Sequence, residues 1–242
     1  MKIHSNLLIV AYAAISAIST ASAATIYSDS LNGASTPLNN STVDSSAAFA
    51  GGTSGATWTA AAGINQTTTG AALPTNTMAF LPITITAGNI YTLQATMTSI
   101  GEGWGALGFS DSSTTDGAWH TTNTKYAWGL LRPVGVVGNN QFFAGGGTTN
   151  GVPWASVAPG TQTMTITLDT TNAFWSTYAS INGANSDTFT YTTNPVDITH
   201  VGFGVQFATS EVSNFSLTAV PEPSVALLGG LGLMALLRRR RA

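Results

Sequence analysis

Cysteine is absent from the 242-residue chain, and charged side chains make up only 7% of it. Without cysteine there is no disulfide framework, no thiolate zinc site and no cysteine nucleophile. Soluble domains usually carry about 25% charged residues, so this surface is built mostly from hydroxyl, amide and apolar groups. The glycine-rich segment 145–151 lacks the lysine and the strand-to-helix context of a phosphate-binding loop.

Basic residues are scarce between the two ends of the chain. From Ala24 to Val220 the cations are Lys125 and Arg132, against nine carboxylates, which gives this segment a net charge of −7. A surface of that sign repels phosphate backbones. The sequence therefore argues against nucleic acid as a partner.

The first 23 residues have the pattern of a secretory signal peptide. A short basic region precedes the apolar stretch Leu7–Ile18, and residues 21–23 form a small-x-small cleavage site. The stretch is short and rich in small residues, which argues against the alternative of a membrane anchor. No twin-arginine pair precedes it, so the sequence predicts export by a Sec-type route with cleavage after Ala23.

The C-terminal end, residues 220–242, combines three features. The motif Pro221-Glu222-Pro223 is followed by the apolar run Val225–Leu237 and then by a cluster of arginines, Arg238, Arg239, Arg240 and Arg241. A helix over the apolar run would be about 20 Å long, shorter than the ~30 Å hydrocarbon core of a bilayer. The arginines favour the cytoplasmic side. A weak span with these flanks fits a transient membrane tether that awaits a protease.

This tail closely resembles the PEP-CTERM sorting signal, which consists of a Pro-Glu-Pro motif, a short apolar helix and an arginine cluster. In that family an exosortase recognises the signal; it is a membrane-embedded, cysteine transpeptidase-like enzyme of Gram-negative bacteria that produce exopolysaccharide. The resemblance implies an exosortase as partner, anchoring in the inner membrane before processing, and removal of the tail during sorting to the cell surface. The alternative is an ordinary tail anchor that contains the motif by chance.

Between the two ends, short segments alternate between apolar and polar side chains. Thr163–Leu168 and Tyr91–Met97 alternate strictly, and Val201–Phe207 places every large side chain on one face. Such segments are typical of half-buried antiparallel strands. The other expected strands are Ile26–Leu31, Trp58–Ile64, Met78–Ile85, Trp104–Ser110, Tyr126–Arg132, Gln141–Ala144, Phe174–Ile181, Asp187–Thr192 and Glu211–Thr218.

Many short strands at turn-bounded spacing predict an all-β fold. We expect one antiparallel jelly-roll β-sandwich over residues 24–219, with an N-terminal signal helix and a short C-terminal transmembrane helix outside it. Asn182-Gly183 is expected to join a hairpin. The segments 197–205 and 212–217 resemble parts of concanavalin-like lectin and laminin-G sandwiches, in which the last strand often returns beside the first.

The sequence contains no evident catalytic pair. A glycosidase needs two carboxylates that flank the scissile bond, and hydrolases that resemble this fold often carry Glu-x-Asp-x-x-Glu, which is absent here. The glutamates of the domain are Glu102 and Glu211, far apart in sequence, and no Gly-x-Ser-x-Gly elbow accompanies His120 or His200. We therefore expect no enzymatic activity, with a secreted glycan-active hydrolase as the alternative.

The densest acidic loop, residues 111–117, is a candidate calcium site. It places Asp111 and Asp116 among serine and threonine hydroxyls, and calcium takes several oxygen ligands. Its spacing is not that of an EF-hand. Sandwiches of the lectin and laminin-G type often hold calcium in loops at one rim, so the resemblance supports Asp111 and Asp116 as metal ligands. The alternative is a solvated turn.

Six tryptophans fall within the exported domain, and flat rings with a polar edge suit the faces of sugars. Trp119, beside the acidic loop, and Trp154 are the candidate ligand-binding residues, whereas Trp104, Trp128 and Trp175 are expected in the core. The sequence thus predicts an exported surface or extracellular-matrix protein with exopolysaccharide as its candidate ligand. A purely structural protein without a ligand is a further alternative.

Overall fold

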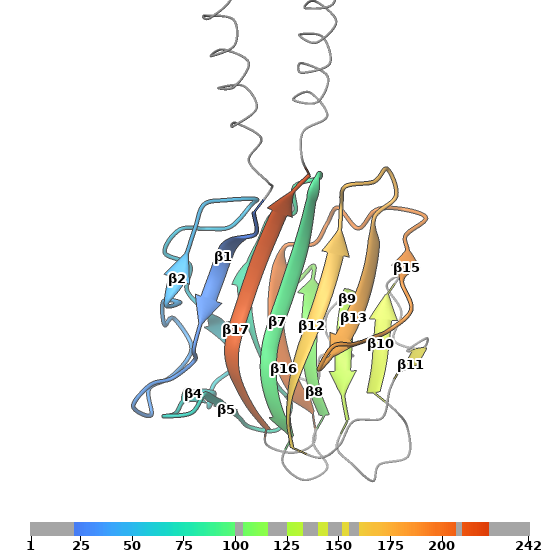
Figure 1. Ribbon diagram of the computed structural model, residues 1–242. Helices are drawn as coiled ribbons and strands as arrows, with labels where there is room; N and C mark the ends of the chain where they lie inside the picture. The colour runs from blue at the N-terminus through green and yellow to red at the C-terminus, as the bar shows by residue number, and fades with distance from the viewer. Residues whose placement is uncertain are drawn as a thin grey trace, which may run out of the picture.

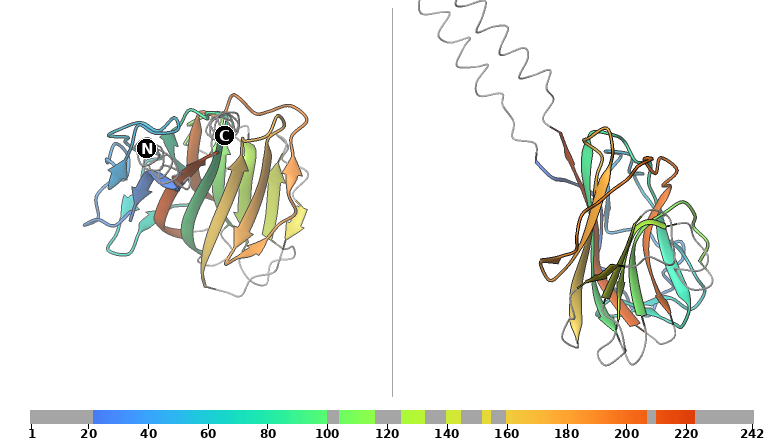
Figure 2. Two further views of the ribbon diagram at one scale, coloured as in Figure 1. Left: turned by 45° about the horizontal axis from the view of Figure 1, so that its top comes forward. Right: turned by 90° about the vertical axis from the view of Figure 1, so that its right-hand side faces the viewer.

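The structure is a computed structural model that describes residues 22–99, 104–115, 125–132, 140–144, 152–154, 160–206 and 210–222. Within these residues the secondary structure consists of seventeen β-strands, which form two sheets packed face to face (Figures 1 and 2). In the same residues no helix is long and apolar enough to cross a membrane.

The larger sheet has ten strands. They are β1 (Ala24–Asp29), β2 (Ser45–Ser46), β4 (Asn65–Gln66), β5 (Ala71–Leu73), β7 (Asn89–Ser99), β12 (Thr161–Asp169), β13 (Ser176–Ile181), β14 (Ala184–Asn185), β15 (Phe189–Thr190) and β17 (Ser210–Pro221). Their order is β14-β13-β12-β7-β17-β1-β2, with β15 beside β13, β5 beside β17, and β4 beside β5. Every pairing within this sheet is antiparallel.

The smaller sheet has seven strands. They are β3 (Thr59–Ala60), β6 (Thr77–Pro82), β8 (Trp104–Ser110), β9 (Lys125–Leu131), β10 (Asn140–Ala144), β11 (Val152–Trp154) and β16 (His200–Gln206). Their order is β11-β10-β9-β8-β16-β6-β3, and these pairings are antiparallel as well.

The core lies between the inner faces of the two sheets, as the alternation predicts. In β7, Tyr91, Leu93, Ala95 and Met97 are at most 1% exposed, while the intervening polar side chains are only half-buried. Inward residues of β12 and of the smaller sheet complete the same apolar cluster. Because successive side chains of a strand point to opposite faces, one face of the larger sheet is left polar.

The outer face of the smaller sheet carries a second apolar layer. Its buried members include Phe80 and Trp128, which belong to a cluster separate from the main core. Each of these side chains packs onto a glycine of the neighbouring strand: a Cβ at Gly202 would lie 2.8 Å from Phe80 Cδ1, and a Cβ at Gly108 would lie 2.3 Å from Trp128 Cβ. Both glycines therefore make room for an aromatic neighbour.

The predicted all-β sandwich is confirmed, and the last strand does return beside the first. Ala219 of β17 pairs with Ala24 of β1, and Asn182-Gly183 joins β13 to β14 in a two-residue hairpin with both residues at positive φ. The predicted strand Trp58–Ile64 is reduced to β3, and the predicted strand Phe174–Ile181 begins only at Ser176. The expected signal helix and transmembrane helix lie outside the described residues.

The chain leaves the sandwich at one end, which we call the tail pole. It is formed by the end of β17 together with three loops, residues 83–88, 170–175 and 191–199 (Figure 1). Hydrogen bonds join these segments: Gly88 N donates to Thr170 O at 3.0 Å, and Ile83 N donates to Thr199 O at 2.8 Å. The tail pole is therefore a connected surface rather than a set of separate loops.

Candidate functional site

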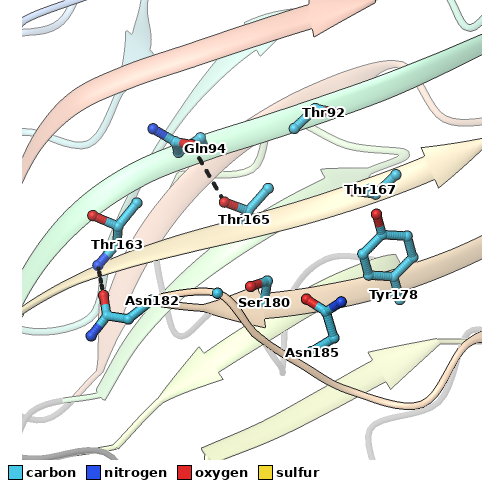
Figure 3. Close-up of a pocket in the computed structure, with 10 residues that line it drawn as sticks. Thr92, Gln94, Thr163, Thr165, Thr167, Tyr178, Ser180, Asn182 and Asn185 are labelled. Atoms are coloured by element: carbon cyan, nitrogen blue, oxygen red, sulfur yellow. Dashed lines mark hydrogen bonds between the residues drawn. The ribbon is translucent and has the colours of Figure 1, made fainter.

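A polar groove lies on the outer face of the larger sheet, across β7, β12, β13 and β14 (Figure 3). Its volume is about 490 Å³. The lining residues share uncharged hydroxyl, amide or glycine chemistry, with one aromatic ring; they are Thr92, Gln94, Thr163, Thr165, Thr167, Tyr178, Ser180, Asn182, Gly183 and Asn185. None of the ten is charged.

Strand register arranges the groove residues in rows across the sheet. One row is Thr92, Thr167 and Tyr178, because Thr167 pairs with both of the others. The next row is formed in the same way around Thr165, which pairs with Gln94 and Ser180. Neighbouring strands lie about 4.8 Å apart and alternate residues about 6.7 Å apart along a strand, so the polar groups form a regular two-dimensional array.

Several groove side chains are held in place before any ligand arrives. Asn182 Oδ1 accepts a hydrogen bond from Thr163 N at 2.9 Å (Figure 3). The Asn182 side-chain amide also donates to Gln162 Oε1. Thr165 Oγ1 lies 3.5 Å from Gln94 Oε1, to which it donates. Threonine is stiff at χ1 because it is β-branched. The array therefore loses little side-chain entropy on binding a partner.

The tail-pole end of β8 holds the predicted calcium ligand Asp111. Thr199 Oγ1 donates to Asp111 O at 2.9 Å, and the Tyr126 hydroxyl donates to the Asp197 carboxylate. Burial, the bond to Asp197 and the negative charges of Asp197 and Asp111 together raise the pKa of Tyr126. Burial lowers the pKa of His200, and the negative charge of Asp111 acts in the opposite direction, toward a higher pKa.

The calcium prediction stays a prediction. Its second ligand, Asp116, lies outside the described residues, and so does Trp119. Within the part of the chain that the structure describes, no group of three or more acidic or histidine side chains is placed to hold a metal ion. Glu102 is likewise not described, so the possible pairing of Glu102 with Glu211 is also untested.

Of the three tryptophans expected in the core, Trp128 and Trp175 are buried there. Trp58, Trp128 and Trp175 are at most 5% exposed and belong to the apolar clusters, while Trp104 is only half-buried. The guanidinium of Arg132 lies 4.4 Å from the centre of the Trp104 ring, so that face of the ring is already covered. The backbone of Trp154 lies in β11, opposite Asn140.

The groove is a site that the sequence reading missed. The alternation of Thr163–Leu168 predicts a half-buried strand, but it assigns no function to Thr163, Thr165 or Thr167. A usable signal was present, because a solvated sheet face normally carries lysine and glutamate, whereas this one carries hydroxyls and amides almost throughout. Which of these side chains share a row depends on strand register, and alternation alone does not determine it.

The Pro-Glu-Pro motif begins inside the folded domain. Pro221 is the last residue of β17 and pairs with Asn89, and Glu222 N donates to Gly88 O at 2.8 Å. Gly88 has a positive φ of 83° and has open space where a Cβ would stand. The remaining motif residues, Pro223 and Arg238–Arg241, lie outside the described residues.

Several known structures are similar to this sandwich. The endo-1,3-β-glucanase of Streptomyces sioyaensis has a TM-score of 0.50 at 12% identity, covering 84% of this chain and 98% of the glucanase. Lectin II of Ulex europaeus scores 0.43 at 11% identity, covering 68% and 92%. A sialidase scores 0.46 at 11% identity, but 66% of this chain corresponds to only 16% of the sialidase. At these identities, the similarities are evidence about the fold alone.

Sequence comparison identifies the tail. No curated protein matches the chain, whereas the family model of the PEP-CTERM protein-sorting motif matches residues 219–241. That motif is the recognition signal of an exosortase, and it implies export with C-terminal membrane anchoring before processing. The chain therefore carries a PEP-CTERM protein-sorting motif whose first residues complete the last strand of an antiparallel β-sandwich.

Proposed function

We propose that this protein is a cell-surface or extracellular-matrix component, sorted by an exosortase, whose sandwich domain binds a neutral exopolysaccharide in the groove of β7, β12, β13 and β14. The observation that carries the proposal is the chemistry of the groove: ten lining residues without a charge, all of them on regular strands or in the hairpin that joins β13 to β14. Their fixed hydroxyls and amides match the donors and acceptors of sugar hydroxyl groups.

The Tyr178 side chain adds an apolar surface to this array. It is half-buried on β13 and lies beside Thr167 in the same row (Figure 3). Sugar-binding sites commonly combine a ring of this kind with a few positioned polar groups. The net charge of −7 over residues 24–220 disfavours anionic polysaccharides, so the proposal specifies a neutral chain.

We propose binding without hydrolysis. A glycosidase requires two carboxyl groups about 5–9.5 Å apart around the bond, and none of the ten groove residues carries a carboxyl group. The competing hypothesis, a glycan-active hydrolase, would need its carboxylates elsewhere on the domain. Release of reducing ends from a neutral glucan by the purified protein would support that competitor.

The test is the affinity of the protein for neutral polysaccharides, screened on a glycan array and measured by titration calorimetry. Thr165→Val removes one central hydroxyl and should weaken binding by about 0.5–1.5 kcal/mol. Tyr178→Ala should weaken it by ~1–3 kcal/mol if the ring contacts the sugar.

A matched control lies on the same face. Thr218 of β17 pairs with Thr92 but does not line the groove, so Thr218→Val should leave the affinity unchanged. Equal losses for Thr165→Val and Thr218→Val, or binding of charged glycans only, would contradict the proposed site.

A further inference from the structure

Exposed apolar side chains gather at and beside the tail pole. Among the described residues, the large hydrophobic side chains exposed by more than a third are Phe174 (59%), Val196 (76%) and Phe189 (38%). Phe174 and Val196 lie in two tail-pole loops, and Phe189 lies on the short strand β15 just before the second loop (Figure 1). Single exposed hydrophobic residues are ordinary on a protein surface, but these occur together at one end of the domain.

Hydrogen bonds hold Phe174 in its exposed position. Asn194 bonds the backbone on both sides of it, because Asn194 Oδ1 accepts from Trp175 N at 2.8 Å and Asn194 Nδ2 donates to Ala173 O at 2.9 Å. The next side chain, Trp175, is 5% exposed and anchors the loop in the core. Phe174 is thus presented outward by a fixed loop.

Val196 is presented in a similar way from the neighbouring loop. Val196 N donates to Asn194 O at 2.9 Å, which closes a tight turn around Pro195. Tyr191 and Ile198 are at most 4% exposed and anchor the loop on both sides of that turn. Asn194 therefore connects the two loops and fixes both apolar side chains on the same surface.

The tail leaves the domain from this same surface. Glu222 N is bonded to Gly88 O, Gly88 N is bonded to Thr170 O, and Thr170 opens the loop that carries Phe174. After Glu222 only Pro223 and Ser224 precede the apolar run at Val225. The three residue-to-residue steps from Glu222 to Val225 span at most about 10 Å. An inserted tail therefore keeps the tail pole at the bilayer surface.

We propose that the tail pole is a membrane-docking surface on which Phe174 and Val196 enter the interfacial region of the bilayer while the tail is still attached. The inference rests on the membrane anchoring that the sorting motif implies, and it is independent of glycan binding. Two apolar side chains bind a bilayer weakly by themselves, but the short tether of Pro223 and Ser224 supplies a high effective concentration. Docking would fix the orientation of the domain, and hence of Pro221-Glu222-Pro223, above the membrane.

The charges of the tail pole specify the type of lipid surface. Asp111, Asp169, Asp197 and Glu222 lie at or next to it, against the cation Lys125, whose backbone pairs with Ser110 at the same end of the sandwich. Anionic lipids would repel these carboxylates, so the occupant that fits is a zwitterionic bilayer. Contact driven by apolar side chains should also persist at high salt, where attraction between exposed charges is screened.

The experiment uses the full chain reconstituted in phosphatidylcholine vesicles that contain headgroup nitroxide lipids. Since the chain has no cysteine, a single introduced cysteine takes a fluorophore at one position. Asn172→Cys places the label in the exposed loop beside Phe174, and Thr68→Cys places it in the exposed turn between β4 and β5, at the opposite end of the sandwich (Figure 1). We expect quenching by the lipid nitroxide at position 172 and none at position 68.

Substitutions of the two apolar side chains then test their role. Phe174→Ser with Val196→Ser should reduce quenching at position 172 by at least about threefold, because the interfacial contact is lost. Phe174→Leu, which keeps an apolar side chain, should retain most of the quenching. Both changes are at exposed positions, and unchanged circular dichroism would show that the fold is intact.

The possible outcomes separate docking from anchoring. Flotation of the chain with vesicles but equal or absent quenching at the two positions would overturn the docking surface, and so would an unaltered signal in the double variant. Stronger quenching on anionic than on zwitterionic vesicles would overturn the assigned lipid chemistry. Failure of the full chain to float would overturn the anchoring on which the inference rests, whatever the result of glycan binding.

Discussion

Asp29 is a carboxylate inside the sandwich, 1% exposed on β1. Its Oδ2 accepts from Trp58 Nε1 at 2.6 Å and its Oδ1 accepts from Leu31 N at 2.7 Å. Trp58 in turn contacts the rings of Phe203 and Phe215, with centroids 5.1 and 4.9 Å away. This carboxylate therefore positions an indole that joins the two sheets.

Burial raises the pKa of Asp29 above its ordinary value, although the bonds from Trp58 and Leu31 work in the opposite direction. The folded state then binds the proton of Asp29 more readily than the unfolded state does. The contribution of this group to stability increases as pH falls through the folded pKa and levels off near the unfolded value of about 4.

From this we predict the behaviour of Asp29→Asn. The asparagine amide keeps one acceptor oxygen, but its NH2 group faces one of the two donors, Trp58 Nε1 or Leu31 N. We therefore expect the free energy of unfolding to fall by about 1–3 kcal/mol at neutral pH. The difference in stability between wild type and variant should increase as pH is lowered toward 4, because only the wild type has a carboxylate at position 29 that gains a proton on folding. Thermal unfolding over this pH range is the measurement, and a gap that narrows would contradict the assignment.

At the scale of the elements, two glycines are required for different reasons. At one of them a side chain would collide with a neighbouring strand, and at the other the backbone has a positive φ. A Cβ at Gly202 in β16 would lie 2.1 Å from Ala79 O, a backbone atom of β6. A Cβ at Gly183 in the β13–β14 hairpin would contact nothing within 4 Å, but φ there is +85°.

We therefore predict that Gly202→Ala destabilises the domain by about 1–3 kcal/mol or more, since two paired strands must separate. Gly183→Ala should cost about 1 kcal/mol, the penalty of a left-handed conformation. Both losses of stability can be measured from the midpoints of urea unfolding, provided that the m-values of wild type and variants are equal. A larger loss at Gly183 than at Gly202 would contradict the described packing of β6 against β16.

Alternation predicted the long strands because one face of each is buried. The segments Tyr91–Met97 and Thr163–Leu168 lie inside β7 and β12. The two-residue strands β2, β4 and β14 were missed, since so short a segment has no period. Trp58–Ile64 was assigned too long because Trp58 is held by Asp29 in a loop, a contact between residues 29 positions apart that no local pattern contains.

The rows of the groove could not be predicted for a related reason. Its rows depend on which threonine of β12 lies opposite which residue of β7 and β13, and this register is determined by the packing of the whole sheet. The sorting motif, by contrast, is local: its three parts follow one another along the chain and need no fold to be identified.

At the scale of the whole molecule, the two surfaces to which we assign different tasks are separate. The groove lies on the side of the sandwich, whereas the termini of the domain leave together at the tail pole, where Ala24 pairs with Ala219 (Figure 2). A domain docked by its pole keeps the side groove open to solvent. Glycan binding should therefore be possible both before and after the tail is removed.

The last prediction concerns that removal. In the native host the mature form should lack Arg238–Arg241 and end near Pro221, because the apolar run is too short for a stable span. A cut after Glu222 would keep every backbone bond of β17, including Glu222 N to Gly88 O, so the mature form should melt at the same temperature as the full chain in detergent. Mass spectrometry of the surface fraction identifies the C-terminus, and mature protein that still carried the four arginines would contradict exosortase processing. Replacing the arginines by glutamine removes the charge that stops translocation, so the unprocessed chain should then slip through the membrane and escape sorting.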